Sequence, residues 1–120
     1  GGLKQFMQIL DKKITYEQLF LIEEETFFHD MMKCVVDTKR KLIAVNAELH
    51  SDLEQLLLEN GSDQHFLYGI NILCDDNEVE FDSLINPPRN REAGYPRAGR
   101  DVADPKAREQ IMEVVNLWIE

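Results

Sequence analysis

Residues 32–61 read MKCVVDTKRKLIAVNAELHSDLEQLLLENG, and this stretch decides the fold class. Two runs rich in aliphatic and β-branched residues, 32–36 and 42–50, flank the turn-forming sequence DTKR. Because the connection is short, the two runs are predicted to pair as an antiparallel hairpin. The sequence from Ser51 to Glu54 matches a capping box, and Gly61 is typical of the residue that ends a helix. The stretch therefore predicts a strand–strand–helix unit.

A second pair of strands is predicted farther along the chain, from Phe66 to Leu73 and from Val79 to Ile85. The polar sequence CDDN between them is typical of a turn. Residues 87–103 are rich in proline, glycine and arginine, and we expect a loop there. The sequence Asp104-Pro105 matches the N-cap and first position of a helix, and an apolar stripe predicts this helix over residues 105–119.

The N-terminal part is predicted to be helical. Apolar residues from Leu3 to Leu10 suit a short helix, and the sequence from Thr15 to Gln18 matches another capping box. The helix that starts there is predicted to continue to about Phe28. Its acidic run, Glu23-Glu24-Glu25, is predicted to face water, and His29 is predicted to lie at its end.

Together these elements predict a single α+β domain over residues 1–120. Its predicted parts are an N-terminal helical segment (1–28), a ββαββ core (31–86), an Arg/Pro/Gly loop (87–103) and a C-terminal helix (105–119). We expect a four-stranded, largely antiparallel sheet with a ββαββα core and with the helices packed on its apolar face.

Side chains alternate between the two faces of a strand, so the predicted sheet has two unlike faces. One face gathers apolar side chains: Ile43, Val45, Ala47, Leu49, Phe66, Tyr68, Ile70, Ile72, Val79, Phe81 and Ile85. We expect the final helix and the helix after Ser51 to cover this face. The other face gathers Asn46, Glu48, His50, Asn71, Glu80, Asp82 and Asn86. This polar face is either open to water or lines a cleft that holds a ligand.

The local pair Glu48 and His50 is the first candidate for chemistry. A carboxylate beside an imidazole raises the pKa of the histidine and can orient it as a general base. With Glu80 or Asp82 the pair offers ligands to a divalent cation. No metal-binding spacing is present, however, so we predict no metal site and no cofactor. The alternative is a structural His50 packed in front of the helix.

The predicted loop concentrates positive charge. Residues 89–100 hold four arginines, Arg89, Arg91, Arg97 and Arg100, and one acid. These arginines either bind phosphate or carboxylate groups of a ligand or pair with the acidic remainder of the protein. The candidate ligand-binding residues are therefore Glu48, His50, Asn71, Glu80, Asp82, Asn86, Arg89 and Arg91.

The net charge and the cysteine content restrict the expected partners and the expected cellular location. The 120 residues carry a formal net charge of −10, which repels phosphate backbones and disfavours nucleic-acid binding. No apolar run approaches the roughly 20 residues of a membrane helix, and residues 1–4 do not begin like a signal peptide. Cys34 and Cys74 are far apart and form no CxxC pair. We therefore expect reduced thiols, a cytoplasmic location and no membrane association.

Seven short segments occur in an order and spacing that carry a family resemblance. They are Ile14-Thr15-x-Glu17-Gln18-Leu19, Val35-Val36-Asp37, Ala47-Glu48-Leu49-His50-x-Asp52, Leu56-Leu57-Leu58-Glu59-x-Gly61-Ser62, Gly69-Ile70-Asn71, Glu80-Phe81-Asp82-Ser83-x-Ile85-Asn86 and Asp104-Pro105-x-x-Arg108. With these segments the chain resembles the bacterial and archaeal family called domain of unknown function 5674. The resemblance implies a domain from about Ile14 onward and a cytoplasmic setting, and it implies no particular activity.

Two functions remain open from the sequence. The first is a cytoplasmic binding or regulatory module that recognises a protein partner or self-associates through exposed sheet edges. The alternative is a small enzyme or ligand binder. In that case the polar face around Glu48, His50, Glu80 and Asp82, together with the loop of residues 89–100, would hold an anionic small molecule.

Overall fold

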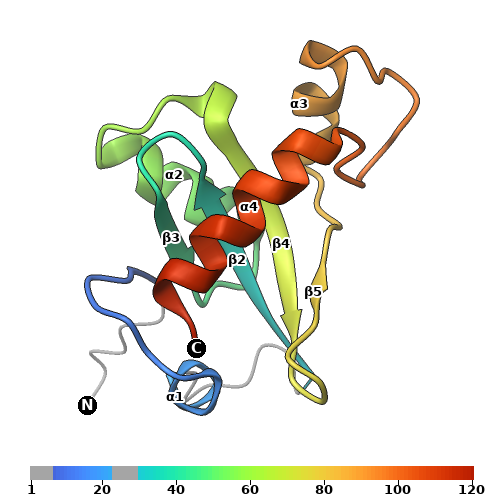
Figure 1. Ribbon diagram of the computed structural model, residues 1–120. Coiled ribbons are helices and arrows are strands. Elements are labelled where there is room, and N and C mark those ends of the chain that lie inside the picture. Colours follow the sequence, from blue (N-terminus) through green and yellow to red (C-terminus); the bar gives the residue numbers. More distant parts are fainter. Residues whose placement is uncertain (1–6, 23–29) are drawn as a thin grey trace.

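The computed structural model describes residues 7–22 and 30–120. Its centre is a five-stranded antiparallel sheet with the strand order β1-β3-β2-β4-β5. Helix α4 crosses one face of this sheet, and helix α2 lies behind it (Figure 1). The strands are β1 (Gln8–Ile9), β2 (Met31–Asp37), β3 (Leu42–Val45), β4 (Leu67–Leu73) and β5 (Val79–Glu80). The helices are α1 (Tyr16–Leu21), α2 (His50–Glu59), the 3-10 helix η1 (Gln64–Phe66), α3 (Asn86–Glu92) and α4 (Pro105–Trp118).

The predicted hairpin is confirmed, because β2 and β3 pair antiparallel. Its turn is held by Asp37, which is fully buried. The Asp37 carboxylate accepts hydrogen bonds from the backbone N–H groups of Lys39 and Arg40, each at 2.9 Å, and from the Ser62 hydroxyl at 2.6 Å. These donors satisfy a carboxylate that would otherwise be costly to bury. Strand β4 pairs along the whole of β2, so these two strands form the centre of the sheet.

The central strands bury apolar side chains on both faces. Cys34 and Val36 belong to the core under α4, whereas Val35 between them belongs to the core under α2. The core under α4 also contains Ile43, Val45, Ile70, Ile72, Ile111 and Val115, and the core under α2 contains Ala44, Ala47, Leu53, Leu57 and Leu67. The prediction that both helices cover one apolar face is therefore wrong. Because β2 is almost continuously apolar, both of its faces need cover.

Three strand boundaries differ from the prediction. Gln8–Ile9, where a helix was predicted, forms the edge strand β1, so the sheet has five strands rather than four. Strand β3 ends at Val45, because Asn46 has a left-handed φ of 74° that interrupts the extended chain. Strand β5 ends at Glu80 and does not reach Ile85.

Two helix boundaries also differ. Helix α2 begins at His50, so the predicted capping box at Ser51 does not form, and Leu49 at the N-cap makes no side-chain hydrogen bond. The predicted loop of residues 87–103 contains most of helix α3. Proline is tolerated in the first turn of a helix because the N–H groups there have no intrahelical acceptor. The sequence PPR therefore opens this helix instead of preventing it.

Three helix signals are confirmed. The Thr15 hydroxyl accepts from the backbone of Gln18 at 3.0 Å, and the Gln18 side chain accepts from the backbone of Thr15 at 2.9 Å. Gly61 follows α2 with a φ of 99°, as expected for a glycine that ends a helix. The Asp104 carboxylate caps α4 by accepting from the backbone of Lys106 at 3.0 Å.

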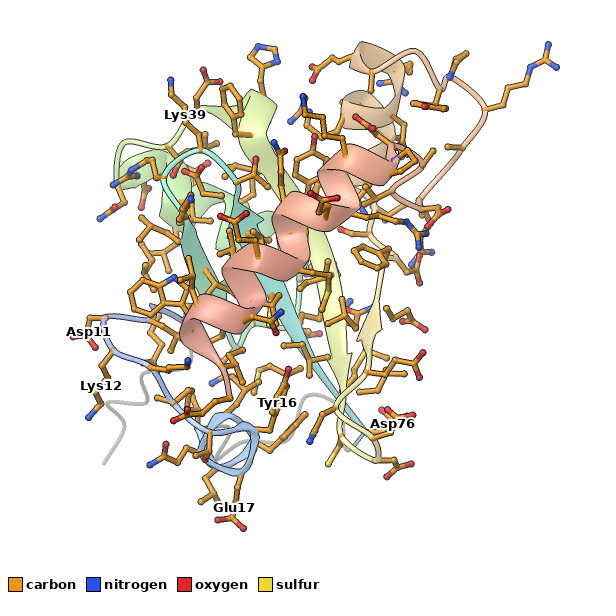
Figure 2. All side chains as sticks on the ribbon, in the orientation of Figure 1. Asp11, Lys12, Tyr16, Glu17, Lys39 and Asp76 are labelled. Carbon is orange, nitrogen blue, oxygen red and sulfur yellow. The ribbon has the colours of Figure 1, made fainter. Side chains whose placement is uncertain are left out.

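Helix α1 packs beside the end of α4. Tyr16 contacts the core under α4, while Glu17 points away from it (Figure 2). The predicted continuation of this helix to residue 28, the acidic run 23–25 and His29 lie outside the described residues, as do residues 3–6 of the predicted first helix. Within residues 7–22 and 30–120, no helix has both the length and the apolar content needed to cross a membrane.

We expect Asn46→Gly to be better tolerated than Asn46→Ala. Asn46 is 1% exposed with φ at 74°, and within the described part of the chain its side-chain amide has no hydrogen-bond partner. Both substitutions remove the unpaired amide, but alanine at this φ retains a strain of about 1–2 kcal/mol that glycine avoids. Chemical denaturation should give a free energy of unfolding about 1 kcal/mol higher for the glycine variant. Equal stabilities of the two variants would contradict the strain at this position.

Candidate functional site

A row of polar residues crosses the sheet on the side of α2. Lys33 of β2 lies two residues before Val35, so it shares the sheet face that packs under α2, and it stands opposite Asn71 of β4. Asn71 stands opposite Glu80 of β5 and donates from Nδ2 to Glu80 Oε1 at 2.9 Å. On the other side of Lys33, the backbone N–H of Asn46 donates to the Lys33 carbonyl at 3.2 Å. The row contains Asn46, Asn71 and Glu80 of the predicted polar face. It also contains Lys33, which was not among the candidate residues predicted from the sequence.

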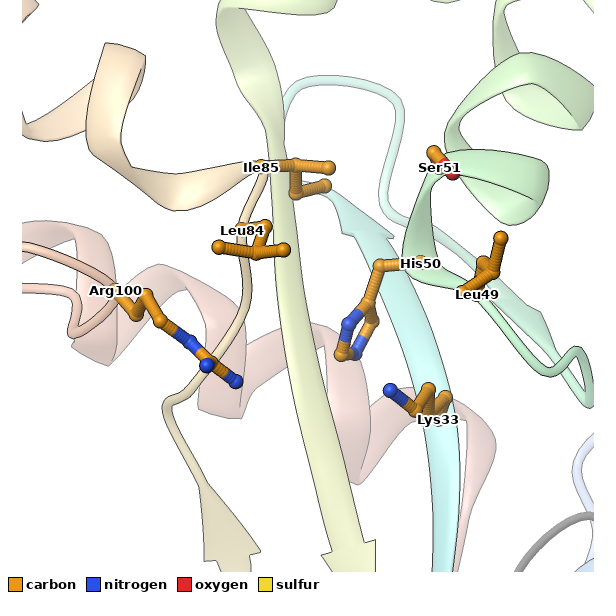
Figure 3. Close-up of a pocket in the computed structure, with 7 residues that line it drawn as sticks. All are labelled: Lys33, Leu49, His50, Ser51, Leu84, Ile85 and Arg100. Atoms are coloured by element: carbon orange, nitrogen blue, oxygen red, sulfur yellow. The ribbon is translucent and has the colours of Figure 1, made fainter.

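A small pocket lies at Lys33, where helix α2 begins. Its volume is about 110 Å³. Figure 3 shows the His50 ring between the side chains of Lys33 and Arg100, with Leu84 and Leu49 on either side. The residues that line the pocket are Lys33, Leu49, His50, Ser51, Leu84, Ile85 and Arg100.

His50 has a defined tautomer. Its Nε2 atom lies 2.8 Å from the carbonyl oxygen of Ile70. Because a carbonyl oxygen only accepts, Nε2 carries the hydrogen and Nδ1 is left as an acceptor. Burial lowers the pKa of His50 to about 4, and the positive charges of Lys33 and Arg100 act in the same direction, against the Ile70 carbonyl and Asp82. His50 is therefore neutral at pH 7, and the prediction of a raised pKa is wrong.

The histidine ring packs against a strand position that has no side chain. A Cβ atom built on Gly69 would lie 2.3 Å from Ser83 Oγ and 3.1 Å from His50 Cδ2. Contacts this short are not compatible with any side chain, so glycine at position 69 is what allows His50 and Ser83 to approach β4.

Two asparagines of α3 position the chain around Arg100. Asn86 accepts from the backbone N–H of Gly69 at 2.9 Å and donates to the carbonyls of Gly69 and Arg100, both at 3.0 Å. Asn90, one turn later, donates to the carbonyls of Gly99 and Asp101 at 3.0 and 2.6 Å. Both side chains are almost completely buried. Helix α3 thus fixes the backbone on both sides of Arg100, and with it one wall of the pocket.

The Arg100 guanidinium is also held by a carboxylate. Its Nε and Nη2 atoms contact Asp82 at 2.8 and 3.2 Å, in a two-point ion pair. A guanidinium has five N–H donors, so this pair leaves donors for another partner.

The remaining predicted residues are distributed between the protein's own contacts and solvent. Arg89 is buried and pairs with Glu92, while its third nitrogen donates to the Gln64 carbonyl. Glu48 and Arg91 are exposed and do not line the pocket. The predicted pairing of Glu48 with His50 assumed a continuous strand through residue 50, which Asn46 interrupts.

Sequence reasoning missed Lys33 and the apolar rim of the pocket. Lys33 was the only charge inside the apolar run 32–36, and a lone charge in a buried strand is a signal that was available. Leu84 and Leu49 had no such signal, because their positions beside the pocket depend on how α2 and residues 81–85 pack on the sheet.

A second hollow, of about 220 Å³, lies between β1 and α1. Its lining includes one acid and one base, Asp11 and Lys12, both exposed, and no buried polar side chain. It therefore indicates a specific ligand less clearly than the His50 pocket does. In the part of the chain that the structure describes, no three His, Cys, Asp or Glu side chains are grouped so that they could hold a metal ion.

The fold and the pocket define a small antiparallel α+β domain with a pocket at the start of one helix, lined by both charged and apolar side chains. A sequence model of the family described as "Protein of unknown function (DUF5674)" matches residues 8–118. The chain therefore belongs to this family, as its sequence segments indicated. Searches of curated proteins and of solved structures found no match.

We expect Gly69→Ala to destabilise the fold by about 2 kcal/mol or more, because the new methyl group would overlap Ser83. The matched control is the double variant Gly69→Ala with Ser83→Gly, in which the two shortest contacts are removed. Denaturation of the four proteins in this cycle should show a favourable coupling between the two substitutions. Simple additivity would show that the close packing of residues 69 and 83 is not what requires glycine.

Lowering the pH should destabilise the protein through His50. Between pH 6.5 and about 4 the unfolded histidine binds a proton that the folded one does not, so the free energy of unfolding falls as the pH falls. The full effect corresponds to about 3 kcal/mol. His50→Gln keeps a donor near Nε2 but does not titrate, so its unfolding free energy should fall less across this window. The same pH dependence in both proteins would contradict the shifted pKa.

Proposed function

We propose that this protein binds a small anion in the His50 pocket. The observation that carries the proposal is the convergence of two cationic side chains, Lys33 and Arg100, with the first turn of α2 around one pocket. Leu49 at the N-cap provides no side-chain acceptor for the first N–H groups of this ten-residue helix. Such an end carries a partial positive charge and free donors, both of which favour an anion.

The size of the pocket restricts the ligand. Pockets for drug-sized molecules and cofactors usually measure about 300–1,000 Å³. A volume of about 110 Å³ instead suits a carboxylate, phosphate or another anion of a few non-hydrogen atoms. The nearby carboxylate of Asp82 is already paired with Arg100, so it limits rather than cancels the positive charge at the pocket.

A protein partner is the second candidate. It is supported by Leu84 and Leu49, which are 75% and 53% exposed beside the pocket and would be covered by a partner that presents an acidic side chain. Strand addition or self-association at a sheet edge has less support, because each edge strand, β1 and β5, has only two residues.

A cytoplasmic location is part of the proposal. Both cysteines are free, and Cys74 is exposed. An exposed free thiol is more compatible with a reducing compartment than with an oxidising one. The formal net charge of −10 likewise supports a ligand smaller than a nucleic acid, whose backbone this charge would repel.

We expect acetate and phosphate to shift the backbone amide resonances of His50 and Ser51 in NMR titrations at constant ionic strength. Lys33→Gln and Arg100→Gln should each weaken saturable binding about tenfold, because each removes one charge-assisted hydrogen bond. Arg97→Gln is the control, since Arg97 is exposed near Arg100 and does not line the pocket. Equal losses in all three variants, or no saturable shifts at residues 50 and 51, would contradict an anion site here.

A further inference from the structure

The pocket offers an acceptor as well as donors. His50 is 7% exposed and lines the pocket, and its Nε2–H is bonded to the Ile70 carbonyl. The lone pair on Nδ1 is therefore an acceptor on a ring that lines the pocket. A ligand with a hydrogen-bond donor can bond to this acceptor, whereas acetate, which has no donor, cannot.

The two sets of groups together define the ligand's chemistry. Lys33, Arg100 and the start of α2 match an anionic group, whereas His50 Nδ1 matches a donor on the same small molecule. An ammonium group would be repelled by the two cations in so small a space, but a neutral hydroxyl group would not. Leu49, Leu84 and Ile85 provide apolar walls that favour a ligand with carbon over an inorganic anion.

We propose that the pocket takes a small 2-hydroxycarboxylate, with its carboxylate at Lys33 and Arg100 and its hydroxyl group donating to His50 Nδ1. This inference rests on the proposed function, because it names the class of anion that the same pocket binds. Sites that hydrogen-bond a ligand hydroxyl discriminate strongly against analogues that lack it, because the site's own polar groups are then left unpaired.

The test compares lactate with isobutyrate, in which a methyl group replaces the hydroxyl group at nearly the same size. Both are titrated into the wild-type protein at pH 7 and constant ionic strength, with NMR shifts of residues 50 and 51 as the measurement. Alanine, which carries an ammonium group, and inorganic phosphate are titrated in parallel. We expect lactate to bind at least about tenfold more tightly than each of the other three.

A variant separates the acceptor from the anion site. His50→Gln retains a donor for the Ile70 carbonyl and removes the Nδ1 acceptor, so lactate should lose more affinity than isobutyrate. A thermal melt of the variant checks that it is folded. If it does not fold, the comparison of lactate with isobutyrate in the wild type still decides the inference.

The outcomes distinguish this inference from the function on which it rests. Equal binding of lactate and isobutyrate would overturn the hydroxyl assignment and leave the anion site standing. Tighter binding of alanine or of phosphate would overturn the choice of a 2-hydroxycarboxylate. No saturable binding of any of the four would overturn the proposed function as well.

Discussion

The side-chain amide of Asn86 connects helix α3 to strand β4 and to the backbone of the pocket residue Arg100. Strand β5 pairs with β4 only at residues 71 and 72, so the backbone of β4 at Gly69 has no strand partner on that side. Asn86 takes the place of that partner by bonding both the N–H and the carbonyl of Gly69, and it also bonds the carbonyl of Arg100. Losing this amide would leave the N–H and the carbonyl of Gly69 unpaired, each costing about 1–3 kcal/mol, and would leave the Arg100 carbonyl with only the backbone N–H of Ser83 as a donor. The position of α3 and of Arg100 therefore depends on it.

Gly69 of β4 also explains the charge and the tautomer of His50. Because Gly69 lacks a side chain, the imidazole can lie against the strand and reach the Ile70 carbonyl. Burial then keeps the ring neutral, and the bond to Ile70 fixes which nitrogen carries the hydrogen. The missing side chain at Gly69 thus contributes to the charge, the tautomer and the orientation of the pocket histidine, His50. A neutral acceptor between two cations follows from packing, not from a carboxylate neighbour as the sequence suggested.

Structural features that depend on neighbouring residues could be predicted from the sequence, whereas features that depend on contacts between distant segments could not. The β2–β3 hairpin, the caps at Thr15 and Asp104, and the glycine after α2 each depend on a few neighbouring residues, and all are confirmed. The assignment of faces was wrong for residues 47–50, because strand alternation was extended past Asn46, where the left-handed backbone ends the strand. Helix α3 was missed because proline was taken as a loop signal, although the first turn of a helix accepts it. The pocket itself required the packing of four separate segments.

The arginine-rich segment supplies one of the two cations of the proposed anion site. Arg100 pairs with Asp82 of the acidic remainder, as one of the two interpretations of the sequence predicted, whereas Arg89 pairs with Glu92 inside the same segment. Arg89 is buried and each of its three guanidinium nitrogens donates to the protein, which indicates a structural role. Arg100 differs because its backbone is fixed by Asn86 and its guanidinium lies at the pocket. Holding a cation in place with one carboxylate lowers the entropic cost of binding a second. A net negative charge on the whole protein therefore does not prevent an anion site, because at short range a positioned guanidinium and ammonium outweigh distant, screened charges.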